Sequence, residues 1–228
     1  YYPRGYGKPG RCMQWNYMLY GRKDSPIEWL RCCTELFARA GLVQNEVDPS
    51  VWTLKGDTPD QDFDVGVFVD DFCYQGPSDK MQWFEKLISK EWPVKLLGDI
   101  VGQQYLGMDV SIDREKRILK INQKTALLKF VKNNGLSSAR TRRTPMDSKT
   151  KLTRKKGPAD DPKLQTEFRQ IVGSLMHFAI VSRPDIAWCA VALSRCQGNP
   201  TPAMLKLAQQ VARYLAGSAD DALTYNCS

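Results

Sequence analysis

The sequence predicts an α+β fold in which two β-hairpins precede a helical C-terminal part. Three valines alternate with other residues and run into the pair Asp70-Asp71, which indicates a hairpin with its charges at the turn. A second alternating region covers residues 104–113 and 117–123. After residue 162, apolar side chains recur at helical spacing, which favours helices over strands.

The first element is predicted to be a helix that begins near Ser25. Ser25 offers an N-cap, Pro26 suits the first helical position, and Glu28 completes a capping box. Gly41 supplies a C-terminal stop. The apolar residues at helical spacing, which predict a buried face, are Trp29, Leu30, Cys33, Leu36, Phe37 and Ala40.

The next elements surround the acidic hairpin. Residues 51–54 read as a short strand, and a polar turn over 55–61 leads from it to the hairpin. After Pro77, a capping box of Asp79 and Gln82 predicts a helix that extends to Glu91. Its inward-facing residues are predicted to be Phe84, Leu87 and Ile88.

The second hairpin is predicted to turn around residues 114–116. A short basic helix over 126–134, closed by Gly135, follows it. Residues 137–162 have no apolar periodicity and are rich in charged residues, Ser, Thr and Pro, so we expect a linker or surface loop there.

The C-terminal part is predicted to be a small helical bundle. One apolar stripe consists of Phe168, Ile171, Val172, Leu175 and Phe178. Two further helices are expected over 184–198 and 202–217, the last capped by Thr201. His177 lies next to the stripe, and we expect a packed core histidine. Residues 222–225 look like the beginning of a strand.

The positive charge of the chain is concentrated in one stretch. The whole sequence carries a net charge of +8, yet residues 114–156 alone hold fifteen Lys and Arg against two acidic residues. The rest of the chain is therefore slightly acidic. A segregated basic stretch indicates phosphate contact more than general solubility, although a solvated, mobile connector remains an alternative.

Several classes of protein are disfavoured by composition. No apolar run approaches the ~18 residues that span a bilayer. The seven cysteines form no Cys-x-x-Cys pair, which favours free thiols in a reducing compartment. One histidine makes a structural zinc site a poor expectation. The sequence opens without Met or a signal-peptide pattern, so we expect a piece of a longer chain.

The acidic pair is the candidate metal site. Adjacent aspartates repel each other unless solvent or a cation lies against them, and paired carboxylate oxygens suit Mg²⁺. Asp64 lies about 20 Å away along an extended strand, so it cannot share an ion with Asp70. A two-metal centre needs another carboxylate from elsewhere. A solvated turn without a metal is the plain alternative for such a pair.

Several ordered motifs resemble one family. Residues 68–71 (Phe-Val-Asp-Asp) resemble the aromatic-x-Asp-Asp motif of reverse transcriptases, and the surrounding chain resembles the polymerase of copia-type LTR retrotransposons. Residues 19–26 (Leu-Tyr-Gly-Arg-Lys-Asp-Ser-Pro) are similar to that family's Leu-Tyr-Gly-Leu-Lys-Gln-Ala/Ser-Pro motif, and Trp29 follows them. Residues 105–110 look like the primer-grip strand. Further similar segments, in the family's order, are 144–147, 172–175, 183–187 and 213–215.

The resemblance implies an RNA-directed DNA polymerase that uses two Mg²⁺ ions, with Asp70 and Asp71 as catalytic metal ligands. The family's further aspartate lies on an earlier strand that nothing in residues 1–67 matches, so we expect the isolated chain to be inactive. The other implied site residues are Tyr20, Gly21, Lys23 and Phe68 for nucleotide and template, Tyr105, Leu106 and Gly107 for the primer grip, and Arg140, Arg142 and Arg143 for the nucleic-acid backbone.

The resemblance also implies an organisation and a set of partners. A partial right-hand palm with a fingers-proximal segment would cover residues 1–122. Thumb or connection helices would cover 123–220, including the basic loop 137–162, and residues 221–228 would lead to a ribonuclease H domain. The partners would be an RNA template, a DNA primer or duplex, dNTP, and polyprotein domains such as integrase and ribonuclease H, with no membrane. The location would be the cytoplasm, within a virus-like particle.

Two departures from the family's motifs bear on activity more than on fold. Arg22 stands where leucine is usual and Asp24 where glutamine is usual, whereas Phe68 in place of tyrosine keeps an aromatic ring. A non-catalytic nucleic-acid-binding remnant is therefore the alternative function. A phosphate-receiving signalling domain with an acidic Mg²⁺ site is a poorer alternative, because it requires a parallel sheet rather than hairpins.

Overall fold

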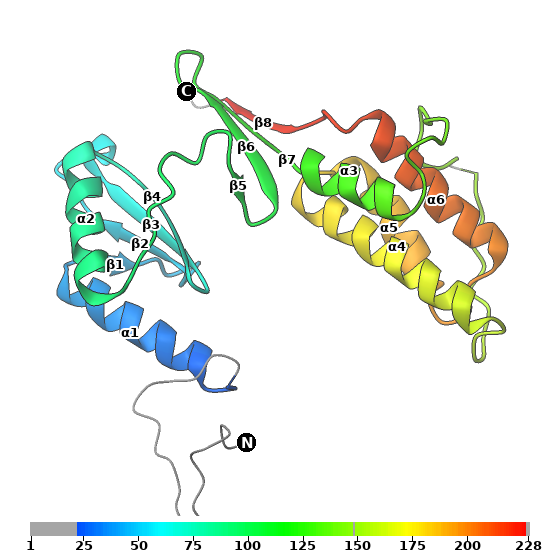
Figure 1. Ribbon diagram of the computed structural model, residues 1–228, viewed down its shortest axis with the longest axis horizontal. Coiled ribbons are helices and arrows are strands. Elements are labelled where there is room, and N and C mark those ends of the chain that lie inside the picture. Colours follow the sequence, from blue (N-terminus) through cyan, green and yellow to red (C-terminus); the bar gives the residue numbers. More distant parts are fainter. Residues whose placement is uncertain (1–21, 148, 227–228) are drawn as a thin grey trace, which may run out of the picture. The chain divides into compact units, whose positions relative to one another are not determined.

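The computed structural model describes residues 22–147 and 149–226, which belong to two compact units, residues 1–96 and 97–228. Each unit has its own antiparallel sheet and its own hydrophobic core, so the α+β prediction is confirmed. Figure 1 shows the chain coloured along its sequence. The boundary between the two compact units lies after residue 96. The boundary between palm and thumb expected after residue 122 concerns functional roles, and it stays a prediction.

The first unit is a four-stranded antiparallel meander with two helices. Its sheet has the strand order β1-β2-β3-β4. The strands are β1 (Val43–Gln44), β2 (Val51–Leu54), β3 (Phe63–Phe68) and β4 (Asp71–Gln75). Helix α1 (Ser25–Arg39) precedes the sheet and helix α2 (Ser78–Glu91) follows it (Figure 1). The predicted acidic hairpin, the short strand and both helices are confirmed.

Aromatic side chains fill the core of the first unit. Alternate residues of β3 are buried, beginning with Phe63, as the period of two requires. Phe37 of α1 lies 5.6 Å from the ring of Trp52 and 5.7 Å from that of Phe84 on α2, so helix and sheet share one cluster. The thiol of Cys33 faces this cluster, and burial raises its pKa to about 12.

The ends of both helices differ from the sequence prediction. Asp24, rather than Ser25, occupies the N-cap position of α1 and makes no side-chain capping bond. The carboxylate of Glu28 accepts hydrogen bonds from Arg31 instead of reaching back, so the predicted capping box is wrong. The box predicted for α2 is also wrong, because that helix begins at Ser78 without a side-chain cap.

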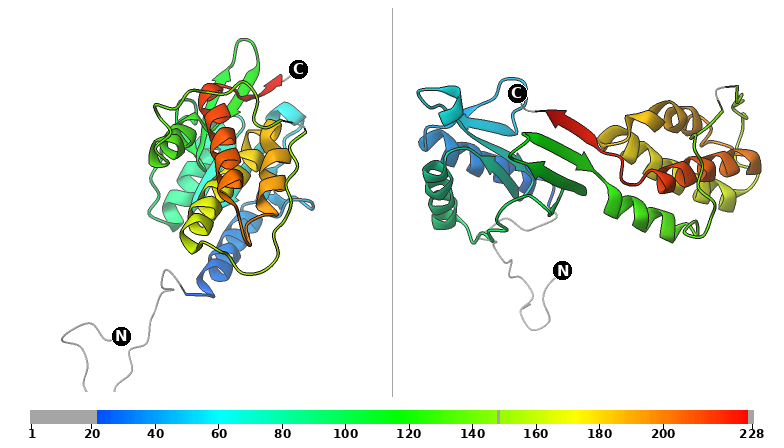
Figure 2. Two further views of the ribbon diagram at one scale, coloured as in Figure 1. Left: turned by 90° about the vertical axis from the view of Figure 1, so that its right-hand side faces the viewer. Right: turned by 90° about the horizontal axis from the view of Figure 1, so that it is seen from above.

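The second unit contains the other sheet, with the strand order β5-β6-β7-β8. Its strands are β5 (Gln104–Tyr105), β6 (Met108–Asp113), β7 (Ile118–Asn122) and β8 (Leu223–Asn226). Asp113 pairs with Ile118, which confirms the second hairpin. The strand expected near the C-terminal end pairs with β7, although the two are far apart in sequence (Figure 2).

Four helices of the second unit share one core. They are α3 (Lys124–Asn133), α4 (Pro162–Val181), α5 (Ala187–Ser194) and α6 (Pro202–Gly217). The predicted stripe of α4 is buried, and the Thr201 cap is confirmed by a 3.3 Å bond from the Met204 amide. The bundle is larger than predicted because α3 joins it. The helix predicted over 184–198 is a short 3₁₀ turn (Pro184–Ile186) followed by α5.

The prediction that His177 is packed in the core is wrong. His177 is exposed, and its Nε2 lies 2.9 Å from the side-chain nitrogen of Gln123. Gln123 is the buried residue, 2% exposed, and its side-chain oxygen accepts a 2.9 Å bond from Ser182. The polar network therefore joins the start of α3 to the end of α4, with histidine at its outer edge.

The basic loop is tied to α6 at its beginning. Arg213 of α6 donates to the carbonyl of Arg140 at 2.7 Å, and Gln210 donates to the carbonyl of Pro145 at 3.3 Å. Met146 is 7% exposed and belongs to the core. A mobile connector is therefore the wrong description of residues 140–146, which form a strap along α6.

A buried guanidinium joins the α4–α5 junction to the end of α6. Arg183 is 3% exposed and donates to both carboxylate oxygens of Asp185, at 2.9 and 2.7 Å. It also donates to the carbonyl of Ser218 at 2.9 Å, and Tyr214 donates its hydroxyl to Asp185. Burial acts to raise the pKa of Asp185, but the bonds from Arg183 and Tyr214 outweigh it and lower that pKa.

None of the helices in residues 22–147 and 149–226 combines the length and apolar character that crossing a membrane requires. The cysteines that lie in these ranges, namely Cys32, Cys33, Cys73, Cys189 and Cys196, are free thiols.

Replacing Phe37 by alanine is expected to lower the free energy of unfolding by about 3–5 kcal/mol, because it opens a cavity at the centre of the aromatic cluster. Urea denaturation monitored by tryptophan fluorescence measures the change. The matched control is Ile27→Ala on the same helix, whose side chain is 72% exposed and whose loss should cost within about 0.5 kcal/mol. Equal effects of the two substitutions would contradict the assigned core.

Replacing Asp185 by asparagine is expected to lower the free energy of unfolding of the second unit by about 1–3 kcal/mol at neutral pH, because Arg183 loses its buried partner while Asp185 itself is partly exposed. A carboxyl whose folded pKa lies below its ordinary 3.8 adds stability that is complete above that value and is lost as pH falls through the folded pKa. The variant should therefore lose less stability than the parent between about pH 5 and pH 2. Asp220→Asn, which removes an exposed pair with Lys124, is the control in the same denaturation series. Identical acid sensitivity of Asp185→Asn and the parent would refute the assignment.

Candidate functional site

The acidic pair lies at the tip of the β3–β4 hairpin. Phe68 pairs with Asp71, so Val69 and Asp70 alone make the reversal. Asp70 and Asp71 are both exposed, and Phe68 is 53% exposed beside them. Among the described residues, neither carboxylate has a lysine or arginine partner within ion-pair distance. The hairpin thus presents two adjacent acceptors to solvent, as the sequence predicted.

The turn holds a valine in an unfavourable backbone conformation. Val69 has a φ of +55°, a left-handed value that β-branched side chains rarely adopt. Two-residue hairpin turns require such values, and Gly or Asn usually supply them. Strain of this kind persists only where the surroundings hold the chain, and it is frequent at functional sites.

Trp29 of α1 contacts this turn from outside the hairpin. Its indole Nε1 donates a hydrogen bond to the carbonyl oxygen of Val69. Its ring lies 6.0 Å from the ring of Phe72 and 4.8 Å from that of Trp92, and these last two rings stack at 6.1 Å. The sequence pattern placed Trp29 on a buried helix face and in a motif, but nothing in it indicated the partner.

The segment before α1 carries the predicted nucleotide-site residues. Tyr20 and Gly21 lie outside the described residues. Lys23 is exposed, and in the described part of the chain no hydrogen bond or ion pair joins it to the acidic turn. Arg22 donates to both carboxylate oxygens of Asp24, at 2.9 and 2.7 Å, and this lowers the pKa of Asp24. The opposite charges of Arg22 and Asp24, the two departures from the family motif, therefore neutralise each other.

Asp64 does not take part in the acidic site. It pairs across the hairpin with Gln75, at the end remote from the turn. Its two carboxylate oxygens accept bonds from Thr53 at 2.7 Å and from Gln75 at 3.3 Å. No group of three His, Cys, Asp or Glu side chains suited to a metal ion occurs within residues 22–147 and 149–226.

The predicted primer-grip residues form a tight turn in the second unit. Tyr105 pairs with Met108, which leaves Leu106 and Gly107 as a two-residue reversal with φ values of +51° and +77°. The next residue but one, Asp109, holds this hairpin to α3 through bonds from the Thr125 amide (2.9 Å) and hydroxyl (2.8 Å). Leu106 thus repeats the strained geometry of Val69.

The predicted backbone-binding residues Arg140, Arg142 and Arg143 are all exposed on the strap along α6. Their main chain is fixed, since Arg140 accepts from Arg213 and the Arg142 amide donates to the Arg213 carbonyl at 3.4 Å. No carboxylate of the described residues pairs with their side chains. The strap therefore offers three exposed guanidinium groups from a backbone that is hydrogen-bonded to α6.

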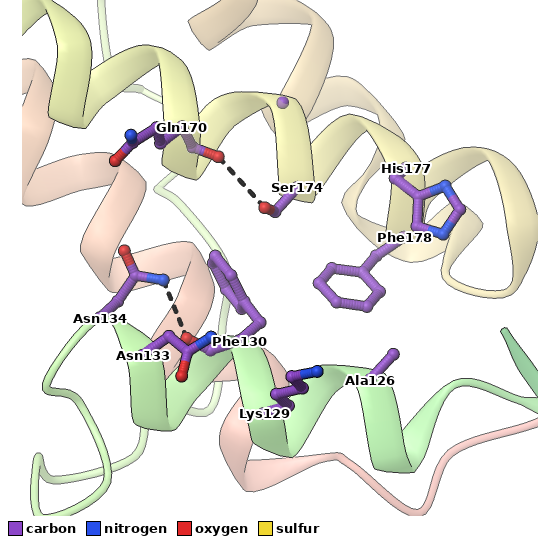
Figure 3. Close-up of a pocket in the computed structure, with 10 residues that line it drawn as sticks. Ala126, Lys129, Phe130, Asn133, Asn134, Gln170, Ser174, His177 and Phe178 are labelled. Atoms are coloured by element: carbon purple, nitrogen blue, oxygen red, sulfur yellow. Dashed lines mark hydrogen bonds between the residues drawn. The ribbon is translucent and has the colours of Figure 1, made fainter. Parts of the chain in front are cut away.

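A hollow that the sequence did not indicate lies between α3 and α4 (Figure 3). Its volume is about 530 Å³, and Phe130 and Phe178 form its apolar wall. The polar side chains around it come from both helices and are Lys129, Asn133, Asn134, Gln170, Ser174 and His177. Gly173 contributes no side chain, which keeps the α4 side of the hollow open.

Comparisons with known proteins agree with the predicted resemblance. The profile of the family described as "Reverse transcriptase (RNA-dependent DNA polymerase)" matches residues 3–148. The chain is 27% identical over 236 residues to the "Retrovirus-related Pol polyprotein from transposon TNT 1-94" of Nicotiana tabacum, covering 99% of this chain. It is 29% identical over 205 residues to the "Retrovirus-related Pol polyprotein from transposon RE2" of Arabidopsis thaliana, covering 89% of this chain.

A third relative is the putative transposon Ty5-1 protein of Saccharomyces cerevisiae, which is 24% identical over 208 residues and covers 91% of this chain. The chain spans 17% of the tobacco relative, 13% of the Arabidopsis relative and 65% of the yeast relative. No solved structure is significantly similar to the chain.

Proposed function

The chain belongs to the reverse transcriptase (RNA-dependent DNA polymerase) family, and we propose that it supplies the acidic hairpin and the duplex-gripping part of a retrotransposon polymerase. The proposal rests above all on the exposed pair Asp70-Asp71 at a strained two-residue turn. In this proposal the first unit belongs to the palm, and the basic strap and C-terminal helices belong to the thumb and connection.

The acidic pair would hold the divalent cations of the polymerase. Its donors are carboxylate oxygens that have no ion-pair partner within residues 22–147 and 149–226, which is a donor set that suits Mg²⁺. Two bound Mg²⁺ ions would neutralise the charge that develops on the transferred phosphoryl group. The protein's own part is to keep Asp70 and Asp71 adjacent and directed to solvent, and the narrow turn does this.

We also propose that residues 1–228 do not extend a primer alone. A two-metal centre draws carboxylates from more than one element, whereas Asp70 and Asp71 come from one turn. Residues 1–21 contain no Asp or Glu. Among the described strands β4 has β3 as its single neighbour, so its other edge is open to a further strand. If the strand that carries the family's further aspartate paired there, that carboxylate would lie beside the turn.

The remaining site residues fit the roles that the family suggests. Tyr20, Gly21, Lys23 and Phe68 would contact nucleotide and template, and Tyr105, Leu106 and Gly107 would contact the primer terminus. Arg140, Arg142 and Arg143 would bind backbone phosphates of the duplex. The partners would be an RNA template, a DNA primer, dNTP and neighbouring polyprotein domains such as integrase and ribonuclease H, within a cytoplasmic virus-like particle.

One observation favours the alternative, a non-catalytic nucleic-acid-binding remnant. The Arg22–Asp24 pair occupies the segment that would lie nearest the nucleotide, where the family usually has leucine and glutamine. Such a remnant would keep the basic strap and its affinity for duplexes but would have no turnover in any longer chain. Primer extension therefore separates the two functions.

Primer extension with Mg²⁺ on an RNA template is expected to fail with residues 1–228 and to succeed with a chain extended upstream through the strand that supplies the further aspartate. The reason is the missing third carboxylate. Asp70→Asn in the longer chain should abolish product while circular dichroism stays unchanged, because a metal ligand is lost and carboxylate repulsion is relieved. Asp64→Asn is the matched control and should retain activity.

Robust product from residues 1–228 would contradict the need for another carboxylate. No product from any longer chain would favour the remnant. Unfolding of Asp70→Asn would instead assign the pair a structural role.

Binding of the chain to duplex DNA is expected to depend weakly on sequence and steeply on salt. Five or six phosphate contacts would give a slope of about −5 for log affinity against log salt, at about 0.9 per contact. Replacing Arg140, Arg142 and Arg143 together by alanine should weaken binding to all sequences alike and make the slope shallower by about 1 per lost contact. Fluorescence anisotropy at several salt concentrations measures both quantities.

The control is the triple alanine variant of Lys86, Lys90 and Lys95, three exposed lysines of the first unit, which removes the same charge elsewhere. It should leave the slope nearly unchanged. The strap variant should alter thermal stability little, because its anchoring bonds use the main chain. A strap variant whose titration overlays the parent would show that the arginines face solvent without binding nucleic acid.

A further inference from the structure

The acidic turn is short and contains a strained residue. It consists of two residues, and the strand ladder ends at the Phe68–Asp71 pair. Val69 sits at a φ of +55° without the freedom of glycine. Its carbonyl oxygen lies outside the ladder, so a partner from another element can fix the peptide that precedes Asp70.

That partner is the indole N–H of Trp29. Helix α1 is anchored by buried residues one and two turns further on, among them Cys33 and Phe37. The Trp29 ring packs against the rings of Phe72 and Trp92, which also pack against each other. The donor therefore comes from an anchored helix and a packed ring, and its bond ends on the residue adjacent to Asp70.

We propose that Trp29 is a positioning residue that fixes the acidic turn through the Val69 carbonyl, and so sets the direction in which Asp70 and Asp71 present their carboxylates. The proposal rests on the proposed metal-binding function of that pair. Without the bond, the Val69–Asp70 peptide is free to rotate toward less strained conformations, which would separate or redirect the two carboxylates.

The test compares Trp29→Phe with Trp92→Phe in the full chain. Both substitutions shrink one ring of the same aromatic group, but the first alone removes the donor to Val69. Amide hydrogen exchange at Asp71, whose pairing with Phe68 ends the strand ladder at the turn, should accelerate about 5-fold in Trp29→Phe when it is measured by NMR. This is the effect of losing one net hydrogen bond of ordinary strength. Trp92→Phe should leave this amide within about 2-fold of the parent.

A second readout uses Mn²⁺ alone as the probe. Mn²⁺ binding, followed by electron paramagnetic resonance, should be several-fold weaker in Trp29→Phe than in Trp92→Phe, and Asp70→Asn should abolish it. Absence of Mn²⁺ binding in the parent would refute the metal-binding function. The exchange data would still decide whether Trp29 fixes the turn.

A third measurement keeps the proposal testable if Trp29→Phe does not fold. In the parent chain the indole proton of Trp29 should exchange slowly with solvent, since a bonded N–H is protected. A freely exchanging indole proton, or equal amide exchange in the two ring variants, would overturn the proposal.

Discussion

The hydrogen bond from the Trp29 indole to the Val69 carbonyl joins helix α1 to the turn that presents the two adjacent carboxylates. The turn contains Val69 in a left-handed conformation and places like charges next to each other, so both strain and repulsion act to open it. What opposes them is the bond from Trp29 and the aromatic packing of Phe72 against Trp92. Helix α1 contacts this turn through Trp29, and the residue that follows α2, Trp92, packs beside it against Phe72 of β4.

In the second unit, like charges also lie close together, but here they are the positive charges of residues 114–156. Residues 114–156 hold fifteen Lys and Arg, and repulsion among these cations would favour an open chain. Hydrogen bonds to α6 fix the backbone of the strap, while the side chains of Arg140, Arg142 and Arg143 stay exposed. The strap accepts hydrogen bonds from α6 at the main-chain carbonyls of Arg140 and Pro145, and its Met146 packs in the core. Arg183, the one buried guanidinium among the described residues, is paired with Asp185. Exposed arginines on a held backbone keep their charge available for phosphates at a smaller cost in conformational entropy than a free tail would have.

The sequence allowed the elements to be predicted wherever one periodicity acted alone. The valines before Asp70 and the stripe from Phe168 to Phe178 fixed a strand and a helix, because burial of one face dominates there. Predictions that depended on a specific partner did less well. Glu28 bonds to Arg31 instead of capping α1, His177 lies outside a core that Gln123 enters, and the strap is ordered by α6. In the candidate site the pair Asp70-Asp71 could be located, but its contact with Trp29 could not, since forty residues separate donor and acceptor and no pattern links them.

The pairing of β8 with β7 has a consequence for how the chain is made. The two strands are separated by about a hundred residues, which gives this sheet a high contact order. During synthesis the edge of β7 stays open until the strand at residues 223–226 leaves the ribosome, whereas all residues of the first unit have left it earlier. The basic strap and helices therefore emerge beside an unpaired strand edge, and a nascent chain that stalls within them exposes a template for aggregation. Pairing of β8 therefore closes this strand edge late in synthesis, in the unit that we propose to grip nucleic acid.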